Sequence, residues 1–109
     1  MPRFLGPFEH LLLLALAHLD DDAYTASIRT FLEDTTGRDV SPGAIYTALS
    51  RLERRGLVSS RFGDPTPERG GKRKKFFRLE PRGAAAVRDA QQQLSRLGRS
   101  LAPRLRSLS

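Results

Sequence analysis

Hydrophobic residues recur at helical spacing in the first part of the chain, between Pro7 and Leu19. Proline suits the first position of a helix, where its missing N–H costs no hydrogen bond. The residues that fall on one helical face are Phe8, Leu11, Leu12, Ala15, Leu16 and Leu19. Leu13 and Leu14 widen this apolar arc, and a helix that is apolar nearly all round must be covered on more than one side. In so small a protein, we expect part of that cover to come from another subunit.

Two further helices are predicted before residue 57. The first covers about Ala23 to Thr35, and Gly37 suits its C-terminal cap. The next begins at Ser41-Pro42, which supplies a hydroxyl N-cap and a proline at the first helical position. Its expected buried stripe is Ile45, Ala48, Leu49 and Leu52, and Gly56 ends it.

A β hairpin is predicted next. Residues 57–62 and 75–79 have the composition of strands. Residues 63–74 between them are too rich in proline and glycine for a helix, and they end in a basic run. The pattern therefore indicates two strands joined by a long basic tip.

A last helix is expected to begin at Glu80-Pro81 and to run towards the C-terminus. Its apolar positions alternate by three and four, which is the seam pattern of paired helices. Pro103 removes one backbone hydrogen bond, so the helix should kink or fray there.

The seam has too little of its own chain to pack against, so we expect a second copy to cover it. Packing within one chain stays open as the alternative. The residues expected at the dimer interface, two of them from the first helix, are Leu12, Leu16, Val87, Ala90, Leu94, Leu97 and Leu101.

Charge is spread unevenly along the chain. The formal net charge is +7, and three arginines and seven acids give residues 1–50 a net charge of −4. Residues 51–109 hold sixteen basic and five acidic residues, a net charge of +11. This concentration of positive charge indicates a polyanionic partner. The alternative is a solvated basic face that serves only solubility.

Length and composition exclude several classes of protein. A chain of 109 residues is expected to form one domain. With no cysteine and only two histidines, it carries no disulfide framework, thiol nucleophile or metal-ligand motif, and no cofactor is expected. The longest apolar run has seven residues, against the ~20 that span a bilayer, and no secretory signal is apparent. We therefore expect a cytoplasmic protein that is not an enzyme.

The outward face of the predicted third helix carries no acid, and the basic hairpin follows at once. A major groove about 12 Å wide admits one helix, and a basic loop beside it reaches flanking phosphates. This order of elements predicts a winged helix–turn–helix. The expected DNA-binding residues are Ser41, Gly43, Tyr46, Thr47, Ser50, Arg51, Arg54, Arg69, Lys72, Arg73 and Lys74.

The same residues resemble a known family. Residues 41–58 read SPGAIYTALSRLERRGLV and are similar to the S-x-G-x-[IV]-Y-x-x-L-x-x-L-x-x-x-G-L-[IV] signature of PadR-type transcriptional regulators. Residues 70–79, GGKRKKFFRL, are similar to the basic, aromatic-ending wing of that family. Ala23-Tyr24 and the leucine-rich first helix also match, so that the resemblance covers about residues 5–83.

The resemblance implies a short PadR subgroup, in which the first and last helices build a dimer. Members are usually repressors that leave promoter DNA when a small molecule binds, often a phenolic compound or a planar drug. The chain departs from the family in three places. It has no tryptophan, whereas some short members hold planar drugs between two tryptophans. Thr25 stands where glycine is usual, and Glu80 stands where a threonine cap is common.

Together these patterns predict a mainly α fold with a small β hairpin. A winged helix–turn–helix would occupy residues 1–80 and a dimerisation helix residues 81–109, in one compact unit. The predicted function is a homodimeric repressor on a pseudo-palindromic operator of double-stranded DNA, released by a small aromatic or hydrophobic effector, with no membrane partner. The alternative is a winged-helix module that binds an acidic protein partner.

Overall fold

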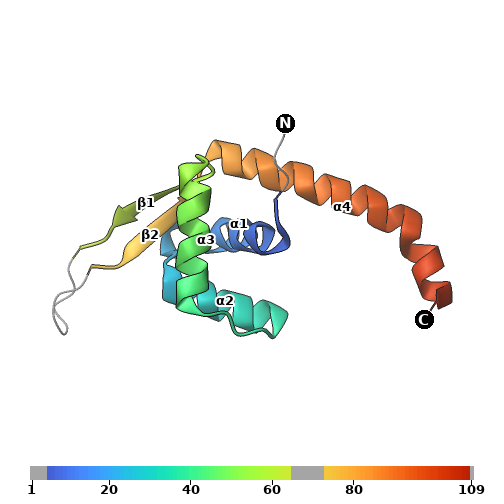
Figure 1. The fold of residues 1–109 in the computed structure, drawn as a ribbon, viewed down its shortest axis with the longest axis horizontal. Coiled ribbons are helices and arrows are strands. Elements are labelled where there is room, and N and C mark those ends of the chain that lie inside the picture. The colour runs from blue at the N-terminus through green and yellow to red at the C-terminus, as the bar shows by residue number, and fades with distance from the viewer. Residues whose placement is uncertain (1–4, 65–72, 109) are drawn as a thin grey trace.

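The structure, a computed structural model, describes residues 5–64 and 73–108. Helix α1 (Pro7–Leu19) is followed by a short 3-10 turn, η1 (Asp20–Asp22), and by helices α2 (Thr25–Thr36) and α3 (Pro42–Arg54). Strands β1 (Val58–Phe62) and β2 (Lys75–Leu79) form an antiparallel hairpin, and α4 (Pro81–Leu108) closes the chain. In Figure 1 the hairpin projects to one side of the helices and α4 runs out to the other. The predicted fold class is confirmed.

Local signals set most of the helix ends. The predicted bounds of α1 are confirmed, and Pro7 occupies its first turn. Helix α2 ends at Gly37, whose φ of 74° lies in the left-handed region that glycine adopts without strain.

The start of α2 differs from the prediction by two residues, because Ala23 and Tyr24 are extended and pair with β2. The Phe77 N–H donates to the Ala23 carbonyl at 2.8 Å, and Tyr24 forms a bridge with Phe76. The Ser27 hydroxyl then caps α2 by accepting the Tyr24 N–H at 2.9 Å. The chain before α2 therefore holds the hairpin against the helices.

The core lies around α1. Four α1 residues, Leu12, Leu13, Ala15 and Leu16, are buried, where α1 packs against α2, α3, β2 and α4. The expectation that another subunit covers part of α1 is thus wrong for these four residues. On that helix's apolar arc, Leu11 is exposed, and Phe8, Leu14 and Leu19 are half-buried.

A close approach fixes the beginning of α4. The Glu80 N–H donates to the Leu57 carbonyl at 3.0 Å, and Gly83 is buried against the same carbonyl, where a Cβ would overlap the oxygen. The first turn of α4 therefore packs on the junction between α3 and β1. Of the two outcomes predicted at Pro103, a kink or fraying, fraying does not occur, since α4 continues to Leu108. Figure 1 shows α4 bending in its C-terminal part.

Within residues 5–64 and 73–108, none of the helices combines the length and the apolar character needed to cross a bilayer.

Candidate nucleic-acid interface

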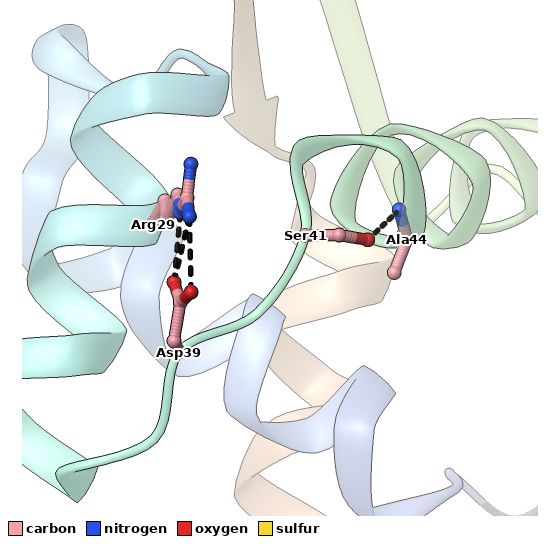
Figure 2. A network of polar contacts seen from close by, with 4 residues as sticks. All are labelled: Arg29, Asp39, Ser41 and Ala44. Carbon is pink, nitrogen blue, oxygen red and sulfur yellow. Dashed lines mark hydrogen bonds and ion pairs between the residues drawn. The ribbon is translucent and has the colours of Figure 1, made fainter.

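The N-terminus of α3 is fixed by its first residues. The Ala44 N–H donates to the Ser41 hydroxyl oxygen at 3.1 Å, as Figure 2 shows, and Pro42 occupies the first turn. A side-chain oxygen at this position satisfies a helix N–H that would otherwise lack a partner. The beginning of α3 is thus held in one conformation while its outer side stays open to a ligand.

An ion pair holds the connection between α2 and α3 (Figure 2). The Arg29 guanidinium donates to the two carboxylate oxygens of Asp39 at 2.9 and 3.1 Å. Hydrogen bonding and the positive charge of Arg29 hold the pKa of Asp39 below its usual value, and Asp39 raises the pKa of Arg29. Such a bidentate contact restricts the conformation of the loop that precedes α3.

One face of α3 is exposed along its length. Ile45, Leu49 and Leu52 face the core, so the opposite face points outwards. The predicted α3 residues gather on that outer face: Ser41, Gly43, Tyr46, Thr47, Arg51 and Arg54 are exposed and Ser50 is half-buried. Glu53, the acid of this helix, is half-buried at the edge of that face, where its carboxylate accepts a hydrogen bond from the Ser60 hydroxyl at 2.7 Å. The exposed residues of the outer face therefore include no acid.

The base of the hairpin supplies more positive charge. Arg73 and Lys74 are exposed, and the Lys74 ammonium lies 4.3 Å from the centre of the Tyr24 ring. Two predicted residues of the tip, Arg69 and Lys72, lie outside the described residues. The name wing is used below for residues 62–75.

Lys75, which is not among the predicted DNA-binding residues, lies between α3 and the base of the hairpin. Its ammonium lies 3.3 Å from the Tyr46 hydroxyl and between 5.1 and 5.8 Å from the centres of the Tyr46, Phe77 and Phe62 rings. Phe62, the cross-strand neighbour of Lys75, is 62% exposed. Strand alternation could have found this residue, because Lys75 shares a sheet face with Phe77, whose ring packs edge-on against Tyr46.

This arrangement places the positive charge of Lys75 between the outer face of α3 and the base of the hairpin. Ring faces attract the ammonium, and a lysine ammonium has three donors, of which Tyr46 engages one. In the described part of the chain, no ion pair joins Lys75 to an acid. Its charge is thus available to an anion bound beside Tyr46 and the base of the hairpin.

The predicted dimer residues fall into two groups. Leu12, Leu16 and Val87 are buried in the core of a single chain, so the structure does not place them on the surface. Leu94, Leu97 and Leu101 are exposed, and Ala90 is half-buried. Two further exposed leucines that the prediction omitted, Leu105 and Leu108, continue the same seam.

A groove of about 510 Å³ lies where the seam meets α1, lined chiefly by Leu11, Leu14, Leu94 and Leu97. His10 also lines it, and the buried His10 Nε2 has no hydrogen-bond partner within the described residues. Residues 5–64 and 73–108 contain no cluster of side chains suited to a metal ion.

Comparison with known proteins agrees with this geometry. The family model of the PadR-like transcriptional regulators matches residues 13–89. A PadR family regulator from Clostridium difficile R20291 has 21% identity and a TM-score of 0.73 over 92% of this chain and 99% of its own. A PadR-like transcription factor from Bacteroides fragilis has 22% identity and a TM-score of 0.74 over 87% and 86%. A PadR family regulator from Eggerthella lenta has 26% identity and a TM-score of 0.70 over 87% and 80%. Among curated proteins we found no match.

Proposed function

The chain belongs to the PadR-like family of transcriptional regulators, and from this premise we propose that it is a homodimeric repressor of transcription that binds double-stranded DNA. It binds a pseudo-palindromic operator and leaves it when a small aromatic or hydrophobic effector binds. The observation that carries the proposal is the capped, acid-free outer face of α3 beside the positively charged wing. A helix of this kind fits a major groove, and a basic wing fits the phosphates beside it.

The two ends of α3 have different roles in this proposal. The N-terminal turns of a recognition helix point at the base edges, so Ser41, Gly43, Tyr46 and Thr47 lie nearest the bases. Ser50, Arg51 and Arg54 lie farther along and hold phosphates. The wing residues Arg69, Lys72, Arg73 and Lys74 contribute affinity that depends little on sequence.

The seam of α4 supports the homodimer. Its leucines from Leu94 to Leu108 are between 44% and 69% exposed, and a contiguous row of exposed leucines is typical of a surface that another protein covers. A second copy presents the same row, and a two-fold axis then relates two recognition helices to two half-sites. Residues 1–80 form the DNA-binding part in this arrangement, and residues 81–109 form the dimerisation helix of the same unit.

The groove between α1 and α4 supports the effector site. It is apolar at Leu11, Leu14 and Leu94, and the His10 Nε2 has no hydrogen-bond partner among residues 5–64 and 73–108. A hydrophobic molecule with a single polar group fits these properties. Helix α4 lines the groove and also carries the dimer seam. An effector bound in the groove would therefore move α4 and change the spacing of the two recognition helices. The protein acts in the cytoplasm and catalyses no reaction in this proposal.

Fluorescence anisotropy on two ~30-bp duplexes across a salt series tests the proposal. One duplex comes from the region upstream of the protein's own gene, and the other has the same composition in scrambled order. We expect the upstream duplex to bind at least ~10³-fold more tightly at ~150 mM salt. Equal binding to both duplexes that vanishes with salt would contradict the proposal and favour the winged-helix module that docks on an acidic protein.

A further inference from the structure

A second positively charged surface lies on α4, away from α3 and the wing. Helix α4 carries six arginines and one acid, Asp89. Arg88, Arg96 and Arg99 are exposed, and at about 100° per residue they fall within one third of the helix circumference. Gln92 and Ser95 lie among them on the same face. We call this face, defined by Arg88, Gln92, Ser95, Arg96 and Arg99, the arginine stripe.

The arginine stripe lies on the opposite side of α4 from the leucine seam. Arg99 is two residues beyond Leu97, and Arg88 is two residues before Ala90, a displacement of more than half a turn. Leu94 and Leu97 line the groove against α1, so the stripe points away from the rest of the chain. Every residue from Gln91 to Arg99 is exposed, and Figure 1 shows this part of α4 extending beyond the other helices. A partner that covers the seam would leave the stripe open.

Within the described residues, no ion pair joins Arg88, Arg96 or Arg99 to an acid. Asp89, the one acid of α4, lies beside the stripe, and no ion pair in the described part of the chain joins it to the stripe. From Arg88 to Arg99 the three charges extend over about 16 Å of helix, at ~1.5 Å per residue. Like charges placed this close repel each other and favour the binding of an anion along the helix.

The residue types on the stripe distinguish between kinds of polyanion. A protein partner needs apolar or aromatic anchors, and the five stripe residues include none. Single-stranded nucleic acid is held by aromatic stacking, which is also missing from those five. Arginine, glutamine and serine are the side chains that contact the sugar–phosphate backbone of a duplex. The composition thus matches duplex DNA contacted without base readout.

We propose that the arginine stripe binds the backbone of a second DNA duplex, so that the protein joins its operator to another DNA segment. This function goes beyond operator binding by α3, because it gives α4 a ligand of its own. It requires neither an effector nor a particular sequence in the second duplex. In the proposed homodimer, on which this function rests, the two stripes face away from the seam, so that both remain accessible while the operator is bound.

A two-duplex capture assay tests this proposal. The upstream duplex is immobilised and saturated with protein, and a fluorescent duplex of unrelated sequence is then added at ~100 mM salt. We expect the wild-type protein to retain the second duplex. The variant Arg88→Gln/Arg96→Gln/Arg99→Gln should retain at least ~10-fold less, while its affinity for the upstream duplex changes less than ~3-fold. Glutamine removes the charge and keeps a good helix former, and sedimentation checks that the variant remains a dimer.

Single variants provide a charge-matched control. Arg99→Gln and Arg78→Gln each remove one exposed arginine, and only Arg99→Gln should lower the salt dependence of second-duplex capture. Equal capture by the triple variant and the wild type would overturn the proposal, as would a wild-type protein that captures no second duplex. If the stripe bound polyglutamate and not duplex DNA, the proposal would be overturned, and an acidic protein would be the indicated partner. Stripe-dependent capture without specific binding of the upstream duplex would contradict only the proposed repressor function.

Discussion

The Lys75 ammonium lies 3.3 Å from the hydroxyl oxygen of Tyr46, and this contact joins the base of the wing to the outer face of α3. The two residues are 29 positions apart in the chain. Because Lys75 also lies over the rings of Phe62 and Phe77, its charge is held in place before any ligand arrives. A phosphate bound there would contact α3 and the base of the hairpin at once.

Removing the charge of Lys75 should weaken DNA binding without changing its sequence preference. Lys75→Met keeps the apolar stem over the rings, so we expect the slope of log K against log salt to fall by ~0.9, the value for one phosphate. Anisotropy on the upstream and scrambled duplexes measures both slopes. Lys75→Arg keeps the charge and serves as the control. A slope that Lys75→Met leaves unaltered would contradict a phosphate contact.

Arg73 and Lys74, two exposed basic residues of the wing, should also contribute to DNA binding through phosphate contacts, and the effects of removing them should add. We expect Arg73→Ala/Lys74→Ala to lower affinity for both duplexes by similar factors and the salt slope by up to ~1.8, or ~0.9 for each lost phosphate contact. The control is Arg78→Ala, which removes an exposed arginine of the same hairpin. Selective loss of operator binding alone would show that these two residues contact bases instead.

The leucine seam can be tested by placing a charge in it. Leu97→Asp should dissociate the dimer, because an unpaired carboxylate would be buried between two apolar faces. Sedimentation equilibrium reports the change of mass. Gln92→Asp places the same charge on the arginine stripe, away from the seam, and should leave the dimer intact. A dimer that persists in Leu97→Asp would require a different interface.

The close packing of α4 on the α3–β1 junction predicts opposite effects for two glycines. Gly83→Ala puts a Cβ into the Leu57 carbonyl, so we expect the free energy of unfolding to fall by about 1–3 kcal/mol. Gly98 has open space around it in the same helix, and Gly98→Ala should raise the free energy of unfolding by about 0.5–1 kcal/mol. Urea denaturation measures both. Equal effects would mean that α4 does not pack on this junction.

The Arg29–Asp39 pair predicts an acid-sensitive contribution to stability. The pKa of Asp39 in the folded protein lies below 3.8, so the unfolded chain takes up this proton first as the pH falls. The contribution is complete above about pH 5 and is lost as the pH falls below 3.8 and through the folded pKa. Urea denaturation across this pH range should show that the free energy of unfolding falls less steeply with decreasing pH in Asp39→Asn than in the wild type.

A double-mutant cycle provides the control for that prediction. Arg29→Gln should reduce this pH dependence as Asp39→Asn does, and the double variant should add nothing further, because either change already removes the pair. Fully additive effects would show that the two residues act separately.

Local chemistry in the sequence predicted the elements that have strong end signals. Pro7 marks the start of α1 and Ser41-Pro42 the start of α3, because these residues satisfy or remove helix N–H groups wherever they occur. The amphipathic pattern of α3 likewise predicted which side faces outwards. Predictions of this kind succeed because the determining atoms lie within one helical turn.

The sequence failed where a residue's environment is made by a distant segment. Ala23 and Tyr24 read as helix, and they are extended because β2 offers them backbone partners. Leu12 and Leu16 fit a dimer seam by pattern, and they are buried because α1 is surrounded by its own chain. Helical periodicity marks an apolar face without saying what covers it.

By itself, then, the sequence determined the order of the elements, the acid-free face of α3, the family resemblance and the basic wing, all of which depend on residues close together in the chain. Only the tertiary structure decided that Lys75 meets Tyr46, that Gly83 must lack a side chain, and that the arginine stripe points away from the leucine seam's groove. Those relationships arise when the hairpin and α4 pack on the helices, and the distances they fix join residues that no local pattern connects.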